Sequence, residues 1–453
     1  MSVSLPDFAE TIKRDPQTFR AQTIDTLVKD AVFGDDAGKD EARRAIRRAA
    51  AAVGILPASI QSLYQAIGRG EAGGFTTPAM NLRAMTYDAA RAVFRAAKRL
   101  EVGAFILEIA RSEMGYTDQR PGEYAAVILA AAIKEGHEGP VFIQGDHFQM
   151  NAKKYAKDPE SERHAIEALI EEAIPAGFFN IDIDTSTLVD MSKPTEPEQQ
   201  RVNFTEAAHF TKFIRAREPE GVTISVGGEI GEVGKEVSSP EEFRAFMDGY
   251  RADLPAGVAG VSKISINTGT THGGVVLPDG TVKKVEIDFP AMRAISEIAR
   301  KEYGLAGAVQ HGASTLAPEL FHRFPENGAC EVHLATEFQN MTYERIPADL
   351  REEMYAWVKE NAADERKPDD TDEQFFYRSR KKAIGPFKER LWTLPDAARE
   401  EVSAALEEKF AFLFQKLRVP GTKEAVARYV AAVDVADAAA AAGAFHRDDE
   451  AGD

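Results

Sequence analysis

Short apolar runs alternate with amphipathic stretches from Gly74 onward, and this alternation constrains the fold more than any other feature. Eight of the runs have the length and composition of buried strands. They cover residues 75–81, 103–110, 140–146, 178–182, 222–228, 261–267, 307–312 and 330–334. Alternating strands and helices predict a parallel sheet, and eight repeats over about 270 residues match a (β/α)8 barrel. We therefore predict an α/β protein with a (β/α)8 TIM barrel; a doubly wound sheet is the alternative.

The residues on either side of the alternation are helical in character. Residues 1–70 are charged and rich in Ala and Arg, and residues 398–417 place Val402, Leu406 and Phe410 on one helical face. We therefore expect an N-terminal helical extension (1–70), a barrel domain (71–345) and a C-terminal helical extension (346–453).

Composition excludes several classes of function. The chain has 55 basic and 73 acidic side chains, a formal charge of −18; this argues against a nucleic acid partner, which needs a basic face. A phosphorylated small molecule needs only a local cluster of donors. One cysteine, Cys330, excludes a disulfide framework. The sequence has no recognisable signal peptide and no long apolar run, so we expect a cytoplasmic protein without a membrane span.

Polar residues stand where the predicted strands end. These residues are Asp146, His147, Asp182, Glu229, His272, His311 and His333. The carboxyl ends of barrel strands form the active site in this fold. Three imidazoles that converge there, with one position left open, are the ligand set of a catalytic divalent metal. Zn²⁺ suits this set best, and Co²⁺ or Mn²⁺ also suit it.

Five strings at these strand ends resemble the class II, metal-dependent fructose-bisphosphate/tagatose-bisphosphate aldolases. They are GDHFQ (145–149), GGEIGEVG (227–234), GTTHGG (269–274), QHGAST (310–315) and CEVHLATE (330–337). The resemblance implies three zinc ligands, His147, His272 and His311. It implies Asp146 as the catalytic acid/base, and Glu229 as a catalytic acidic residue and alternative metal ligand. A monovalent cation is a further ion that it allows.

The resemblance also implies a substrate and the residues that bind it. The substrate would be a ketose (bis)phosphate, cleaved to dihydroxyacetone phosphate and an aldehyde by a homodimer or higher homo-oligomer. The implied substrate- and phosphate-binding residues are Asn81, Asp182, Gly273, Gly312, Ser314, His333, Thr336 and Arg378. Asp182 has an additional implied role at a second metal, and Arg378 matches a region where the family reaches a neighbouring subunit's substrate.

Several positions depart from the family pattern. His333 stands where the family usually has an asparagine, Ala110 replaces a serine that often ends strand two, and Ala313 replaces a glycine in the phosphate turn. These departures leave the number of substrate phosphates open. Two other functions also stay open: a non-catalytic barrel subunit that supports a partner aldolase, and a barrel isomerase or epimerase that uses the same enediolate chemistry.

Overall fold

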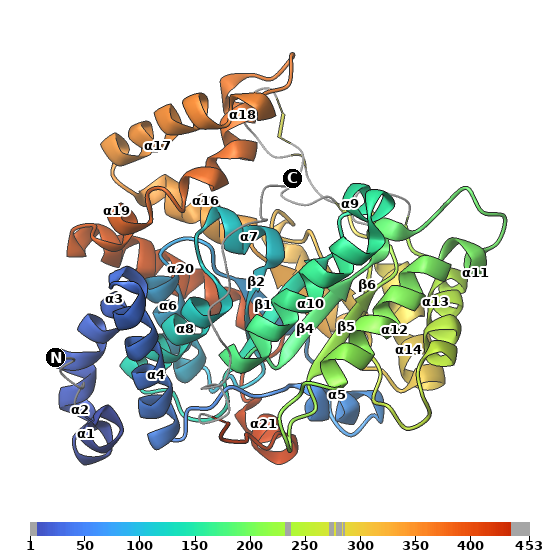
Figure 1. Cartoon of the computed structure of the whole chain (residues 1–453), viewed down its shortest axis with the longest axis horizontal. Helices are drawn as coiled ribbons and strands as arrows, with labels where there is room; N and C mark the ends of the chain where they lie inside the picture. The colour runs from blue at the N-terminus through green and yellow to red at the C-terminus, as the bar shows by residue number, and fades with distance from the viewer. Residues whose placement is uncertain (1–6, 232–236, 271–275, 278–282, 284–285, 436–453) are drawn as a thin grey trace.

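A computed structural model describes residues 7–231, 237–270, 276–277, 283 and 286–435, and within these residues parallel strands close into a barrel (Figure 1). The strands are β1 (Thr77–Asn81), β2 (Ile106–Ala110), β3 (Phe142–Gln149), β4 (Asn180–Asp184), β5 (Ser225–Glu229), β6 (Lys263–Ile266), β7 (Ala308–Gln310) and β8 (Glu331–Leu334). Each strand pairs with the next, and β8 pairs with β1, for example Ala79 with His333. The predicted (β/α)8 barrel is confirmed, and the ring closure excludes a doubly wound sheet.

Helices cover the outside of the barrel. They are α6 (Thr86–Arg99), α7 (Arg111–Tyr116), α8 (Pro121–Glu135), α9 (Ala152–Lys157), α10 (Pro159–Ala176), η2 (Ser186–Leu188), α11 (Glu196–Gln199), α12 (Arg201–Arg215), α13 (Pro240–Asp253), α14 (Phe289–Tyr303), η3 (Pro318–Leu320), α15 (Arg323–Glu326) and α16 (Thr336–Arg345). In α6 the stripe of Ala89, Val93 and Ala97 is buried, because positions three and four apart share one helix face.

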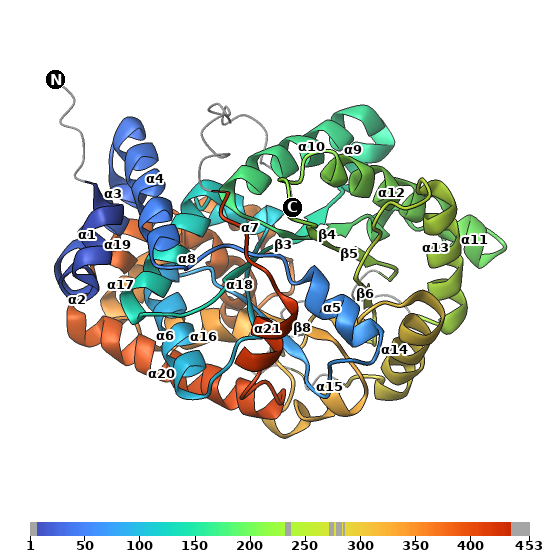
Figure 2. The same ribbon diagram turned by 90° about the horizontal axis from the view of Figure 1, so that it is seen from below.

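The N-terminal residues form helices that pack beside and beneath the barrel. They are α1 (Phe8–Arg14), α2 (Pro16–Thr18), η1 (Phe19–Thr23), α3 (Ile24–Phe33), α4 (Asp36–Ala52) and α5 (Gln61–Gly68). The Ile60 N–H, just before α5, donates to Asn180 Oδ1 at 2.9 Å, and the Tyr64 hydroxyl donates to Glu331 inside the barrel. Helix α5 therefore covers the amino end of the strands, which Figure 2 shows from below.

The C-terminal residues form a second group of helices. They are α17 (Ala348–Asn361), η4 (Ala363–Glu365), α18 (Asp372–Ser379), η5 (Arg380–Ala383), α19 (Lys388–Trp392), α20 (Asp396–Lys416) and α21 (Lys423–Tyr429). Helix α20 buries Val402, Leu406 and Phe410, and Gln374 of α18 donates to the Val276 carbonyl at 2.9 Å, on the segment after β6. No helix in the described part of the chain has the length and apolar character that a membrane span requires.

Candidate metal centre and active site

A β-bulge in β3 brings Asp146 and His147 to the same side of the sheet. In a regular strand, neighbouring side chains point to opposite faces. Here the register between β3 and β4 shifts between Gly145 and Phe148, and His147 has a φ of +40°, which is uncommon for a residue other than glycine. A Cβ on Gly145 would lie 2.4 Å from the Phe148 ring. The bulge therefore depends on glycine at this position.

One group of donors in the mouth consists of His147, His311 and Glu229. Glu229 Oε2 lies 3.5 Å from Nδ1 of each histidine, and the two imidazole centroids are 4.2 Å apart. Asp184 Oδ2 lies 3.0 Å from His147 Nδ1 and orients the ring. Nitrogen and carboxylate donors at this spacing fit a divalent transition metal. His272, the third expected ligand, lies outside the described residues.

A second group shares His311 and adds Asp146, Asp182 and His333. One donor atom from each lies within 4.8 Å of the others. However, Lys263 Nζ is 3.0 Å from Asp182 Oδ2, so a fixed cation already neutralises this carboxylate. The group of His147, His311 and Glu229 is therefore the better candidate for the metal.

Buried charges form a layer beneath these donors. Lys263 opens β6 and its Nζ donates to Gln144 Oε1 at 2.8 Å, to Asp182 and to Glu331. Burial alone would lower the pKa of Lys263, but Asp182 and Glu331 outweigh burial and raise it. The ammonium therefore stays protonated, which makes this lysine a poor nucleophile.

Four carboxylates surround His333. Three come from other strands, and the fourth, Glu331, comes from its own strand, β8. Its Nδ1 lies 3.1 Å from Glu108 and 3.2 Å from Asp146; its Nε2 lies 3.5 Å from Asp182 and 2.7 Å from Glu331. Burial would lower the pKa of His333, but Glu108 and Asp146 raise it well above its ordinary value. In this arrangement the ring is a cation that holds the surrounding carboxylates together.

Asp146 is an ionised carboxylate at the centre of the mouth. Burial would raise its pKa, but His147 and His333 lower it well below its ordinary value. Its Oδ2 accepts from Asn81 Nδ2 at 3.4 Å. Asp146 can therefore accept a proton from a group that enters the mouth.

Three of the expected phosphate-binding residues, Gly312, Ser314 and Thr336, belong to the loop after β7 and the start of α16. Gly312, with a φ of +69°, follows His311, and Ser314 Oγ accepts from the Ala335 N–H at 2.8 Å, next to Thr336, the first residue of α16. The loop after β7 and the end of β8 are thus joined. Gly273 lies outside the described residues.

Arg378 belongs to a different part of the molecule. It lies in α18, where its guanidinium pairs with Asp370 and donates to the Glu365 carbonyl at 2.9 Å. Within this chain, the structure does not bring Arg378 into the cluster of His147, His311 and Glu229.

Sequence reasoning missed several residues that shape the site, chiefly Asp184, Lys263, Glu331, Glu108 and Glu113. The period-two alternation of strands carried a signal for some of them. Asp184 is two residues after Asp182 and extends the same face of β4, and Glu331 is two residues before His333 on β8. Lys263 opens its strand, at the opposite end from the carboxyl ends where the fold predicts the active site.

A closed barrel whose mouth gathers imidazoles and carboxylates defines a (β/α)8 protein with a candidate metal-dependent active site. The sequence matches the family model for fructose-bisphosphate aldolase class-II over residues 61–416, and the chain belongs to this family. Members of the family are typically dependent on a divalent metal, and the buried histidine and carboxylate groups can bind one.

Solved structures of the same fold have low sequence identity to this chain. A probable tagatose 6 phosphate kinase from Sinorhizobium meliloti is 18% identical, with a TM-score of 0.52 over 78% of this chain and 90% of its own. The fructuronate-tagaturonate epimerase UxaE from Cohnella laeviribosi is 13% identical, with a TM-score of 0.51 over 77% and 82%. Fructose-bisphosphate aldolase from Campylobacter jejuni is 16% identical, with a TM-score of 0.48 over 82% and 96%. No curated protein matches the sequence.

Proposed function

We propose that this protein is a metal-dependent aldehyde-lyase that cleaves or forms a carbon–carbon bond in a ketose phosphate. The products of cleavage are dihydroxyacetone phosphate and an aldehyde. The observation that carries the proposal is the buried carboxyl group of Asp146, 3.8 Å from His147 Nε2, beside the group of His147, His311 and Glu229. A base next to a metal group is the arrangement that a metal-dependent retro-aldol reaction requires.

The proposed roles follow from chemistry and position. His147, His272 and His311 hold the metal, and Glu229 is the alternative ligand. A divalent metal bound there supplies Lewis acidity toward the ketose carbonyl and its neighbouring hydroxyl, which stabilises the enediolate character of the cleaved fragment.

Asp146 removes the proton of the substrate hydroxyl at the bond that breaks, and returns it in the condensation direction. Asn81 donates to Asp146 and keeps its carboxylate in place. Gly312, Ser314 and Thr336 receive the phosphate, because the loop after β7 and the start of α16 offer backbone N–H groups and hydroxyls to an anion. Gly273 joins them by the family resemblance.

Two measurements on the purified chain test the proposal. Elemental analysis should find about one divalent ion per chain, as a three-histidine site predicts. The metal-loaded protein, without any partner, should release dihydroxyacetone phosphate from a ketose phosphate.

The other functions left open give different results. A non-catalytic barrel subunit would release no triose without its partner aldolase. An epimerase would convert one ketose to its stereoisomer without a three-carbon product. Absence of metal, with no activation by Zn²⁺, Mn²⁺ or Co²⁺, would remove the central claim.

A further inference from the structure

Three donors at the ends of β1 and β2, from Asn81, Arg83 and Ala110, contact one carboxylate of the protein, that of Glu113. Glu113, in α7, accepts from Asn81 Nδ2 at 2.5 Å and from the Ala110 N–H at 2.8 Å. Its other oxygen pairs with Arg83 Nη2 at 2.5 Å. The contact with Ala110 is the one that caps the start of a helix. Capping does not require the contacts with Asn81 and Arg83.

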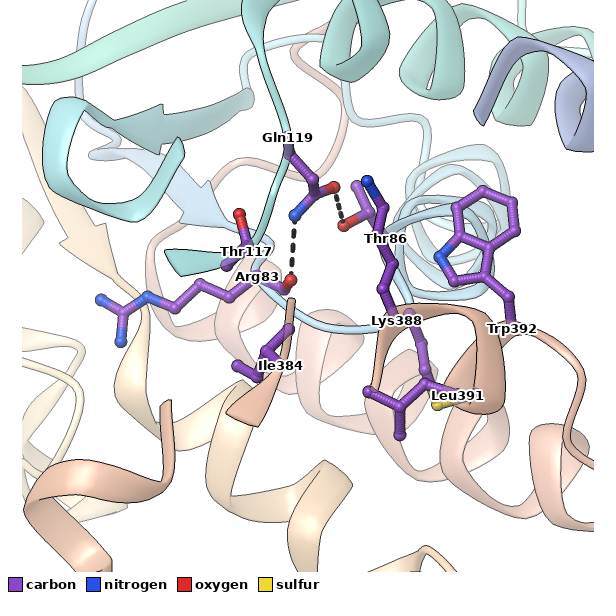
Figure 3. A pocket seen from close by; sticks show the side chains of 9 residues that line it. Arg83, Thr86, Thr117, Gln119, Ile384, Lys388, Leu391 and Trp392 are labelled. Carbon is purple, nitrogen blue, oxygen red and sulfur yellow. Dashed lines mark hydrogen bonds between the residues drawn. The ribbon is translucent and has the colours of Figure 1, made fainter. Parts of the chain in front are cut away.

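Arg83 is anchored in this position by its own backbone. The Arg83 carbonyl accepts from Gln119 Nε2 at 2.9 Å, and Gln119 Oε1 accepts from the Thr86 hydroxyl at 2.6 Å. Figure 3 shows this pair of bonds beside a small cavity of about 10 Å³, with the guanidinium extending away from the cavity. The side chain of Arg83 is 14% exposed and that of Glu113 is 6% exposed, so the ion pair is largely withdrawn from water.

A second cation lies nearby and comes from the C-terminal extension. Lys381 Nζ lies 5.4 Å from the centroid of the Tyr116 ring. Burial and the neighbouring Arg83 lower the pKa of Lys381, whereas Glu113 raises it. Arg83 and Lys381 therefore both lie close to the carboxyl group of Glu113.

Glu113 lies close enough to Asp146 to affect which substrate can bind. Asn81 Nδ2 contacts both carboxylates, Glu113 at 2.5 Å and Asp146 at 3.4 Å. If Asp146 takes the proton at the bond that breaks, the aldehyde half of the ketose extends beyond Asp146. Two donors beside these carboxylates, Asn81 Nδ2 and the Ala110 N–H, are already bonded to Glu113.

We propose that Glu113 excludes a second phosphate, so that the substrate is a ketose monophosphate with an uncharged hydroxyl at the aldehyde end. This inference rests on the proposed function. A phosphate at that end would have to displace Glu113 from Asn81, Arg83 and the Ala110 N–H before these donors could reach it. It would also lie beside the carboxylates of Glu113 and Asp146, which repel it. A hydroxyl can instead donate to Glu113 and needs no free cation.

Ligand binding to the metal-loaded protein tests this inference independently of turnover. Isothermal titration would compare a ketohexose 1-phosphate with the corresponding 1,6-bisphosphate, for both fructose and tagatose. The natural chain should bind the monophosphate at least about tenfold more tightly, the scale of a change of ~1.4 kcal/mol. Glu113→Gln removes the charge, keeps the shape, and should shift this ratio at least about tenfold toward the bisphosphate.

Glu162→Gln is the matched control, because Glu162 is a buried glutamate that pairs with Arg111 at 2.6 Å and does not contact Asn81. It should leave the ratio unchanged. Equal or tighter binding of the bisphosphate to the natural chain overturns the inference, even if Glu113→Gln does not fold. An unchanged ratio in folded Glu113→Gln also overturns it. Binding of neither ligand overturns both proposals, whereas the expected preference without cleavage overturns the proposed function alone.

Discussion

Replacing Lys263 with methionine should destabilise the barrel strongly while leaving its shape intact. The Lys263 side chain is 1% exposed, and its partners Glu331 and Asp182 are 0% and 7% exposed. Methionine fills a similar volume but removes the ammonium, so that His333 is the one remaining cationic partner described for these two buried carboxylates. Removal of one partner from a buried ion pair costs about 3–5 kcal/mol, a large part of the ~5–15 kcal/mol that typically stabilises a folded protein.

Urea unfolding followed by circular dichroism measures this cost, with the denaturant slope as a check on two-state behaviour. Lys301→Met is the matched control, because Lys301 pairs with Glu297 at 3.0 Å but both side chains are exposed. Its effect should stay within about 0.5 kcal/mol. The double variant Lys263→Met/Glu331→Gln should recover part of the loss, because it removes one of the unpaired charges.

Two results would refute this view of Lys263. A loss of less than about 1 kcal/mol would mean that the buried carboxylates take up protons and do not need the ammonium. A covalent adduct on Lys263 after borohydride treatment with a ketose phosphate would mean that the lysine is a nucleophile. The proposed metal-dependent chemistry would then need replacement by a Schiff-base route.

The barrel could be predicted from the sequence because its strands are short apolar runs that alternate regularly with helices. All eight predicted runs overlap an observed strand. Their boundaries differ by a few residues, because an apolar run does not begin and end where the hydrogen bonds between strands begin and end. The pattern was informative here because parallel strands buried on both faces are rich in apolar residues, which separates them from the amphipathic helices.

The interior charges were harder to predict, since their partners are far apart in sequence. Lys263 and Glu331 are separated by 68 residues, and Lys263 and Gln144 by 119. A charged residue at the start of a strand normally indicates the edge of the buried region. Only the closed ring shows that Lys263 points into the barrel and finds carboxylates from two other strands.

The local shape of the site could not be predicted from the alternation of side chains along the strands. A regular strand would separate Asp146 from His147, and only the bulge after Gly145 brings them together. Similarly, Asn81 was predicted as a substrate residue from the family resemblance, but its bond to Glu113 depends on how α7 begins after β2. Such contacts follow from backbone geometry, which the residue types alone do not specify.

Three further changes test other parts of the structure. Asp146→Ala should keep its metal but lose about 10²–10⁴-fold in turnover; unchanged turnover, measured with metal content in parallel, would mean that another carboxylate is the base. His333→Asn should change the preference among ketose phosphates more than the metal content, and loss of metal would instead identify His333 as a ligand. The last change concerns pH. His137 is buried, contacts the Pro140 carbonyl at 3.2 Å and packs 4.9 Å from the Phe94 ring, and burial lowers its pKa from 6.5 to about 4. Because the folded pKa is the lower one, the unfolded chain takes up the proton first as the pH falls. The contribution of neutral His137 to stability is therefore fully present above pH ~6.5 and is lost by about 3 kcal/mol between pH ~6.5 and ~4. His137→Phe removes this proton uptake, so the difference in unfolding free energy between the natural chain and the variant should change by that amount across the window. Urea unfolding at a series of pH values measures this difference. If the unfolding free energies of the two proteins change with pH in parallel, proton uptake by His137 is not the cause of the loss of stability.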